Sequence, residues 1–434
     1  MIYQVKKLIF RGMRRLVSAA YAFGFRHIII TGYPKVKNAK PALFVANHQS
    51  TFMDGILMGI TAYKANPYIL VRADIFKSKF AKIALDLIRL LPIYRKRDGL
   101  SNVSQNDTVF EKCFQVFDQK GVVALFPEGN HAIERSLRPL QKGAARIAIM
   151  AEERNDFQLD LSIIPVGLHY ENHAERWHDV YIHYGEPFSV LPYKEMYKEN
   201  PQKAFKELTD QIREGIEKEI LDIKWKEEYP LFEQLRQLLK PYAHDLSSNV
   251  KSLVHAENDC LEKIRLQLVD NETKLISLKK KVIDFFQQAR SVGLTEDFQI
   301  VKPNILILII QLVGLILGFP FWLIAKTINA IPEYIIENKI IKGVKDPTWH
   351  ISLRVGVSTF LYPIYYGLLW IILSLIFDWI IGGLVVFSLP LFSVIYYEVE
   401  YLRKKIKNHY LLFRNKQLLK QEKEIVDELK SLIR

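Results

Sequence analysis

The stretch Asn47-His48-Gln49-Ser50-Thr51-Phe52-Met53-Asp54 follows the apolar run Pro41-Ala42-Leu43-Phe44-Val45-Ala46. A short apolar run of this kind is typical of a buried strand. His48 lies just after the end of this strand, and Asp54 follows it in sequence. Histidine is the side chain best suited to take a proton near neutral pH, and a nearby carboxylate can orient its ring. His48 and Asp54 are therefore candidate catalytic residues.

The spacing of His48 and Asp54 constrains where the next helix can begin. Residues six apart on a continuous α-helix lie about 240° from one another, at roughly 3.6 residues per turn. The two side chains can face each other only if His48 lies on the loop before the helix. A purely structural interpretation is also open, in which Thr51 is a helix N-cap, Asp54 completes a capping box, and His48 is a hydrogen-bonded loop residue.

The composition indicates more than one domain and an association with membranes. The chain has 434 residues, 49% of them hydrophobic and 25% charged, with a formal net charge of +13. This length allows more than one domain. A basic excess suits nucleic acid, an anionic membrane surface or phosphorylated substrates, and the apolar segments after about residue 300 favour the membrane. Cys113 and Cys260 form neither a disulfide framework nor a metal-ligand cluster, and we expect no nucleic-acid partner.

Apolar runs of strand length alternate with helical periodicity from residue 26 to about residue 225, which predicts an α/β domain. The expected strands are 26–31, 41–46, 68–71, 121–126, 161–168 and 181–184, and the expected helices are 74–90, 110–119, 144–153 and 205–225. Before this domain, residues 2–20 carry an apolar helical face interleaved with lysine and arginine. This pattern favours a basic amphipathic helix in the membrane interface, and an ordinary core-facing helix is the alternative.

Two further motifs follow strands of this domain. The run 91–98 ends in a cationic cluster that contains Arg95 and Arg97, and a guanidinium suits a phosphate. A solvated charge run is the alternative for that cluster. Phe126-Pro127-Glu128-Gly129 follows the strand 121–126, where Gly129 allows a close approach of backbone to a ligand. Glu128 could hold hydroxyl groups of a ligand or a neighbouring arginine.

Together these motifs resemble the glycerolipid acyltransferases, the family that esterifies glycerol 3-phosphate and lysophosphatidic acid. The family's usual box has four residues between His and Asp, whereas this chain has five, Gln49 to Met53, which is similar to the glycerol-3-phosphate/dihydroxyacetone-phosphate acyltransferase branch. The resemblance covers four blocks over residues 41–187, with Pro165 marking the fourth. The family's usual Arg-Ser after Glu-Gly is replaced here by Asn130-His131, so we carry no role over to that pair.

The resemblance implies transfer of a fatty acyl group from acyl-CoA or acyl carrier protein to glycerol 3-phosphate, with lysophosphatidic acid as the alternative acceptor. The thioester is a substrate, and neither a metal nor a bound cofactor is implied. A non-catalytic lipid-binding membrane module is the alternative of a different class. The implied roles are base and orienting residue for His48 and Asp54, acceptor-phosphate binding for Arg95 and Arg97, acceptor binding for Glu128 and Gly129, and an oxyanion or phosphate contact for Lys142.

Three apolar runs in the C-terminal part, 304–324, 355–377 and 379–397, approach or exceed the roughly 20 residues that cross a bilayer. Cationic residues precede and follow the last two runs, which predicts a hairpin with cytoplasmic ends. The catalytic domain is expected on the cytoplasmic face because the implied reaction needs a cytoplasmic thioester and a phosphorylated acceptor. Gly318-Phe319-Pro320 predicts a turn, so that the first run re-enters the membrane or lies as two short helices in the interface, and a spanning segment is the alternative. The expected regions are an interfacial helix (1–25), an acyltransferase domain (26–225), a helical connection (226–302), a membrane region (303–400) and a charged helical tail (401–434).

Overall fold

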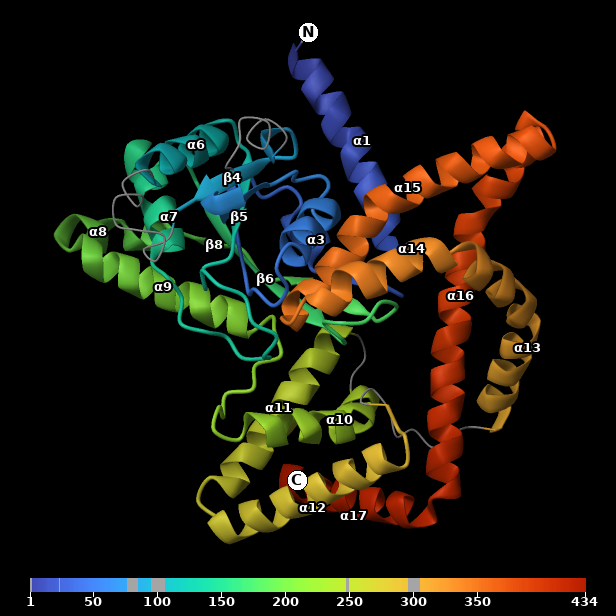
Figure 1. Cartoon of the computed structure of the whole chain (residues 1–434). Helices are drawn as coiled ribbons and strands as arrows, with labels where there is room; N and C mark the ends of the chain where they lie inside the picture. Colours follow the sequence, from blue (N-terminus) through green and yellow to red (C-terminus); the bar gives the residue numbers. More distant parts are fainter. Residues whose placement is uncertain (1, 23, 76–84, 95–105, 247–249, 296–304) are drawn as a thin grey trace. The chain divides into compact units, whose positions relative to one another are not determined.

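The computed structural model describes residues 2–22, 24–75, 85–94, 106–246, 250–295 and 305–434 (Figure 1). Arg95 and Arg97 lie outside the described residues. The chain divides into two compact units. The first unit consists of residues 1–220 and 340–359, and the second of residues 221–339 and 360–434.

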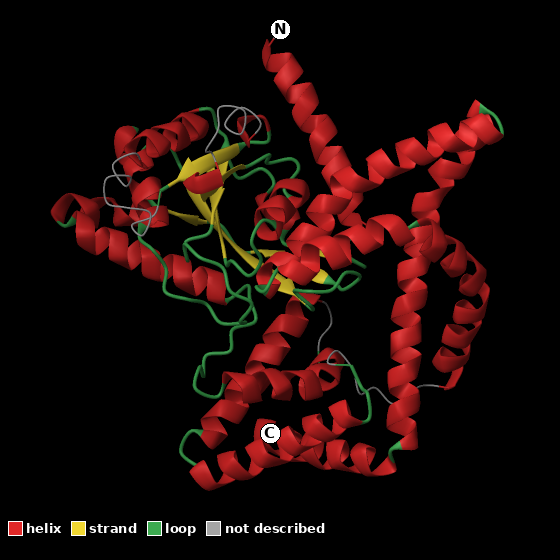
Figure 2. Ribbon diagram, in the orientation of Figure 1, coloured by secondary structure: helices red, strands yellow, loops and turns green. Residues whose placement is uncertain are grey.

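The first unit is built on a mixed sheet, whose strands are yellow in Figure 2. The sheet has eight strands in the order β1-β7-β6-β2-β5-β3-β4, and β8 pairs with β6. The strands are β1 (Ile28–Thr31), β2 (Ala42–Ala46), β3 (Tyr68–Arg72), β4 (Leu90–Ile93), β5 (Val122–Leu125), β6 (Ser162–Tyr170), β7 (Val180–Tyr184) and β8 (Phe188–Ser189). Strand β2 is fully buried and runs parallel to both β5 and β6. Because β2 is covered on both faces, its sequence is a continuous run of apolar residues.

Parallel pairing determines which loops meet. Val45 of β2 lies opposite Leu125 of β5, so the two strands end at the same edge of the sheet. The loop that carries His48 and the turn that carries Glu128 therefore leave the sheet side by side.

Helices cover both faces of the sheet in this unit. They are α1 (Ile2–Ala22), α2 (Tyr33–Val36), α3 (Met53–Thr61), α6 (Asn106–Asp118), α7 (Gly143–Arg154), α8 (Lys194–Glu199), α9 (Pro201–Glu217) and the first residues of α15 (His350–Ile376). Helices α6, α7 and α9 pack on one core. The other core contains α3, the buried Tyr21 at the end of α1, and Ile351 and Val355 of α15.

The α/β class with an N-terminal helix and a helical C-terminal region is confirmed. The ends of two expected helices differ. The helix expected over 205–225 ends at Glu217, and Leu90, expected to close a helix over 74–90, begins β4 instead. Arg89, just before it, has a positive φ of 63°, a backbone conformation that cannot continue a helix. The middle of that expected helix, residues 76–84, lies outside the described residues.

The second unit is helical. Its helices are α10 (Tyr229–Asp245), α11 (Val250–Leu268), α12 (Glu272–Ser291), α13 (Ile305–Ile328), α14 (Ala330–Tyr334), the rest of α15, α16 (Trp379–Arg414) and α17 (Lys416–Ile433). Helices α10, α11, α12 and α17 share one apolar core. Residues of the expected connection 226–302 and of the expected tail 401–434 thus contribute to the same core, with Leu418, Ile425 and Leu429 of α17 buried in it.

Among the described residues, three helices are long and apolar enough to cross a membrane, at Leu308–Ile328, Pro347–Ile376 and Trp379–Arg414. The prediction of a turn at Gly318-Phe319-Pro320 was wrong, because α13 continues through these residues to Ile328. A Cβ on Gly318 would lie only 2.5 Å from a methyl group of Val399 on α16. The glycine therefore permits close packing of α13 against α16, as small residues do in membrane helix pairs. Helix α13 ends at Ile328, and Asn329 follows it.

Candidate active site

His48 and Asp54 meet at the edge of the sheet where β2 ends. Nδ1 of His48 lies 2.7 Å from Oδ2 of Asp54. Helix α3 begins at Met53, so His48 lies on the preceding loop, as the six-residue spacing required. The loop folds back over the first turn of α3, which brings the imidazole onto the carboxylate.

The carboxylate of Asp54 is fully buried and surrounded by hydrogen-bond donors. Its Oδ2 also accepts the backbone N–H groups of Gln49 and Ser50, each at 2.8 Å. Its Oδ1 accepts the hydroxyl of Tyr170. Burial, and then the charge of Asp54, raises the pKa of Tyr170 well above its usual value, so the phenol stays protonated and donates. These hydrogen bonds fix the position of the Asp54 carboxylate.

The contact with Asp54 determines which nitrogen of His48 can act as a base. When the Nδ1–H donates to the carboxylate, Nε2 is left as the proton acceptor. The ring of Phe126 stacks on the imidazole with a centroid distance of 4.3 Å and an interplanar angle of 17°. The side chain of His48 keeps 15% of its surface exposed, so the ring is held in place and still accessible.

The capping-box interpretation of Thr51 and Asp54 was wrong. The N-cap residue of α3 is Phe52, and it makes no side-chain capping bond. The hydroxyl of Thr51 instead donates to the hydroxyl of Ser352 at 3.0 Å. Both oxygens of Asp54 are occupied by His48, the loop amides and Tyr170.

The side chain of Glu128 fixes the backbone of His48 by a hydrogen bond. Its Oε1 accepts the backbone N–H of His48 at 2.7 Å, and its Oε2 accepts Nε of Arg138 at 2.7 Å. The side chain of Glu128 is only 3% exposed. The sequence analysis considered ligand hydroxyl groups and a neighbouring arginine as partners of Glu128, and the structure contains the contact with the arginine. Gly129 has a φ of +68°, a left-handed conformation that favours glycine.

Arg138 also helps to fix the backbone around His48, and the sequence analysis gave it no role at the site. Its Nη2 donates to the backbone carbonyls of His48, at 3.2 Å, and of Asn130. Its own carbonyl accepts Nη2 of Arg213 at 2.6 Å. The chain therefore ties the His48 loop and the Glu128 turn together through one guanidinium.

His131 is a second site residue without a predicted role. Its ring lies edge-on to His48, with centroids 5.5 Å apart, and edge-on to Trp349 at 6.3 Å. Burial, reinforced by the neighbouring His48, lowers the pKa of His131 to about 4. His131 is therefore neutral at pH 7 and adds no positive charge beside the candidate base.

The segment that leads into α15 supplies the remaining wall of the site. The ring of Trp349 meets Phe52 edge-on at 5.2 Å. The carbonyl of Thr348 accepts the hydroxyl of Ser50 at 3.3 Å, and the hydroxyl of Ser352 accepts the N–H of Met53 at 3.3 Å. These residues lie about 300 positions away in sequence, and no local motif indicates their position.

The remaining predicted residues are not brought to His48 by a described contact. Lys142 is exposed and lies at the N-cap of α7. The preceding residue, Gln141, donates its N–H to the carbonyl of Pro127 at 2.7 Å, so Lys142 follows a residue that is fixed to the Glu128 turn. Arg95 and Arg97 are outside the described residues. Among the described residues, no group of three or more His, Cys, Asp or Glu side chains is placed to hold a metal ion.

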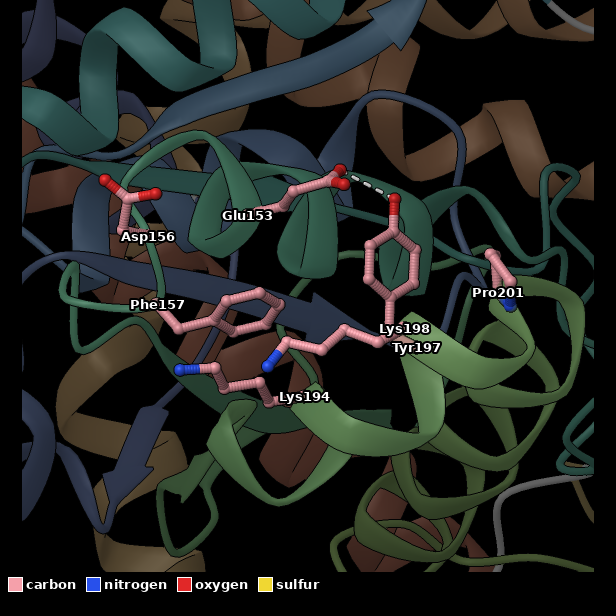
Figure 3. A pocket seen from close by; sticks show the side chains of 7 residues that line it. All are labelled: Glu153, Asp156, Phe157, Lys194, Tyr197, Lys198 and Pro201. Atoms are coloured by element: carbon pink, nitrogen blue, oxygen red, sulfur yellow. Dashed lines mark hydrogen bonds between the residues drawn. The ribbon is translucent and has the colours of Figure 1, made fainter.

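A pocket of about 510 Å³ lies elsewhere in the first unit, between the C-terminal end of α7 and α8 (Figure 3). The hydroxyl of Tyr197 donates to Glu153 across it at 2.6 Å, and Phe157 and Lys194 lie beside them. The N-terminal end of α7, by contrast, follows the residue that is bonded to Pro127. The pocket is therefore at the opposite end of α7 from the His48 site, and we assign it no part in that site.

Residues 27–169 match the family model described as Acyltransferase. This range includes His48, Asp54 and Glu128, and it runs from just before β1 to β6. The fold and the site thus define an α/β acyltransferase domain. This match agrees with the resemblance to the glycerolipid acyltransferases that the sequence motifs indicated.

Two curated relatives come from Saccharomyces cerevisiae. The chain is 24% identical to Glycerol-3-phosphate O-acyltransferase 2 over 369 residues, which cover 78% of this chain and 49% of the relative. It is 20% identical to Glycerol-3-phosphate O-acyltransferase 1 over 277 residues, which cover 58% of this chain and 36% of the relative. The chain therefore spans about half the length, or less, of these relatives.

A solved structure that resembles the chain is that of the 1-acyl-sn-glycerophosphate (LPA) acyltransferase PlsC from Thermotoga maritima. The match has 15% identity and a TM-score of 0.36, and it covers 49% of this chain and 82% of that one.

Proposed function

We propose that the chain is a membrane-bound O-acyltransferase that transfers a fatty acyl group from an acyl thioester to glycerol 3-phosphate. The observation that carries the proposal is the 2.7 Å contact of His48 with the buried Asp54 at the end of β2. The similarity to two yeast proteins named glycerol-3-phosphate O-acyltransferases supports the choice of acceptor. The long spacing between His48 and Asp54 supports the same choice.

In the proposed reaction the acceptor hydroxyl attacks the carbonyl carbon of the thioester while Nε2 of His48 takes its proton. The carbon–sulfur bond then breaks, and the departing thiolate receives the proton from the imidazolium. Asp54 orients the ring and stabilises its cationic form, which is the general arrangement of a base held by a third group. Tyr170 and the amides of Gln49 and Ser50 hold the carboxylate of Asp54 in place.

The negative charge that develops on the thioester oxygen needs hydrogen-bond donors at that position. Lys142 and backbone N–H groups near Gly129 are our candidates. The phosphate of the acceptor is proposed to bind Arg95, with Arg97 as a second cation. Glu128 acts in this proposal mainly on His48 and Arg138, and Gly129 shapes the acceptor pocket.

The apolar helices support a membrane location for the protein. We propose that the first unit faces the cytoplasm, because acyl-CoA, acyl carrier protein and glycerol 3-phosphate are water-soluble substrates. The cationic residues that precede residue 355 and follow residue 397 agree with cytoplasmic ends of the hairpin.

Lysophosphatidic acid is the alternative acceptor, and a non-catalytic lipid-binding module is the alternative of another class. Purified full chain is offered labelled acyl-CoA, or labelled acyl carrier protein, with glycerol 3-phosphate and lysophosphatidate in separate reactions. We expect labelled product with glycerol 3-phosphate. Product with lysophosphatidate alone would overturn the acceptor, and no product with either acceptor and either donor would overturn the proposed activity.

A further inference from the structure

The second unit contains a polar pocket among its apolar helices. The pocket has a volume of about 190 Å³, several times the roughly 30 Å³ that one water molecule occupies in the liquid. Its lining residues come from the end of α13 and from α14, α15 and α16. Its lining residues are Ala325, Lys326, Asn329, Ala330, Glu333, Tyr362, Ser393, Tyr396 and Tyr397.

A carboxylate in this pocket is held by tyrosines from two helices. Glu333 accepts the hydroxyl of Tyr362 on α15 at 2.6 Å and the hydroxyl of Tyr397 on α16 at 3.0 Å. The rings of Tyr396 and Tyr397 meet edge-on with centroids 5.2 Å apart. A carboxylate surrounded by aromatic rings and phenol oxygens is a suitable environment for an ammonium group.

The same pocket also offers a cation. Lys326 is exposed, and its Nζ lies 4.5 Å from the ring centroid of Trp322. The lining therefore presents one positive and one negative side chain. A ligand with a single negative charge would be attracted by Lys326 and repelled by Glu333, whereas a ligand with both charges can satisfy both.

The position of the pocket along the helices indicates its depth. Apolar side chains beyond it on α15 and α16 are exposed, among them Ile364, Leu368, Leu384 and Phe387. Toward the chain end, α16 becomes charged from Glu398 onward. Trp322 and the pocket tyrosines lie between these two zones, as aromatic residues do at the boundary between bilayer and water.

We propose that this pocket binds the headgroup of a zwitterionic phospholipid, with Lys326 at the phosphate and Glu333 and the tyrosine rings at the ammonium group. Asn329, the N-cap residue of α14, lines the pocket, and it links α14 to α16 and α15 by donating to Ser393 and accepting from Tyr366. The lipid is a ligand of the second unit, and its binding does not depend on the proposed acyl transfer.

The test is a lipid-retention measurement on the full chain by native mass spectrometry from detergent. Phosphatidylethanolamine and phosphatidylglycerol with identical acyl chains are offered in equal amounts, with and without soluble phosphoethanolamine. The test variant is Lys326→Gln with Glu333→Gln, which leaves the net charge unchanged. The matched control is Lys420→Gln with Glu424→Gln, an exposed pair on α17.

We expect wild type and control to retain one phosphatidylethanolamine with about tenfold preference over phosphatidylglycerol, and the test variant to lose that preference. Soluble phosphoethanolamine should not displace the lipid. Tyr397→Phe keeps the ring and removes one contact to Glu333, so it should weaken retention even if the double variant fails to fold. Equal retention of both lipids by wild type, displacement by phosphoethanolamine, or an unchanged preference in Tyr397→Phe and the double variant would each overturn the proposal.

Discussion

The hydroxyl oxygen of Ser352 accepts the backbone N–H of Met53 at 3.3 Å, although the two residues are 299 positions apart. The N-cap residue of α3, Phe52, makes no side-chain capping bond of its own. Ser352 therefore supplies from α15 the contact that an N-cap side chain usually supplies from the same helix. The helix that leads into an apolar segment thus fixes the loop between His48 and Asp54.

Replacing Ser352 with alanine should slow the reaction more than it weakens substrate binding. The change removes a partner from Met53 N–H and from the hydroxyl of Thr51. Leaving a buried donor unpaired costs about 1–3 kcal/mol, and we expect kcat to fall about tenfold with KM nearly constant. Steady-state kinetics of Ser352→Ala, compared with Ser388→Ala, whose hydroxyl donates to the carbonyl of Val385 in the same helix, checks this expectation. Equal kcat values in the two variants would refute it.

Replacing Glu128 with glutamine should lower both stability and activity. The amide can accept only part of the hydrogen bonds that the carboxylate accepts from His48 N–H and Arg138, and the ion pair is lost. Breaking a buried pair costs about 3–5 kcal/mol, and we expect about 2–3 here because the Arg138 side chain is 24% exposed.

The matched control for Glu128 is Glu111→Gln, which removes an exposed ion pair with Arg154. Exposed pairs contribute about 0–1 kcal/mol, so this variant should unfold close to wild type. Thermal unfolding and acyl transfer of both variants are measured on the full chain. A Glu128→Gln variant with the stability and rate of the control would contradict the view that Glu128 and Arg138 fix the backbone of His48.

Replacing Arg95 with alanine should act through the acceptor. A charged hydrogen bond to phosphate contributes to acceptor binding, so KM for glycerol 3-phosphate should rise by about tenfold or more while KM for the thioester changes little. Initial rates with each substrate varied in turn separate the two effects. An increase confined to the KM of the thioester would mean that Arg95 lies at the other end of the site.

The first unit should lose stability in mild acid because of His131. Its pKa is lowered to about 4 in the folded protein, from an ordinary value of 6.5. The unfolded chain therefore binds the proton more readily between about pH 6.5 and pH 4, and the free energy of unfolding should fall as the pH drops through this window. Above about pH 6.5 His131 is neutral in both states and has no such effect.

His131→Phe removes the titrating group and keeps an aromatic ring between His48 and Trp349. We expect its unfolding midpoint to decline less than that of wild type between pH 7 and pH 4.5. Thermal unfolding at both pH values measures the difference. The same decline in wild type and His131→Phe would show that His131 is not the source.

The sequence predicted the local parts of this site well and the distant parts poorly. The apolar run 41–46 and the six-residue spacing were enough to predict a strand, a loop histidine and an aspartate at the start of a helix, because each depends on neighbours in sequence. The Glu128 turn was found for the same reason. The parallel pairing of β2 with β5 then brought these two local features together.

The contributions of Ser352, Trp349 and Tyr170 depend on the tertiary fold and have no local signal. Ser352 lies at the start of a long apolar helix, where the hydropathy pattern indicates a membrane segment and says nothing about its first turn. Gly318-Phe319-Pro320 misled us because glycine and proline are typical of turns, whereas Gly318 permits close approach of Val399. A single sequence does not distinguish these two uses of glycine.

The central claim is that His48, oriented by Asp54, removes the proton of the acceptor hydroxyl. The most direct measurement is the rate of labelled acyl transfer to glycerol 3-phosphate by purified wild type, His48→Ala and Asp54→Asn, with thermal unfolding as the check on folding. General-base contributions are typically about 10²–10⁴-fold, and residues that act as a unit lose nearly the same rate when either is removed. We predict a loss of at least about 10²-fold in His48→Ala and a similar loss in Asp54→Asn, with the fold intact. A wild-type rate in folded His48→Ala would contradict the mechanism.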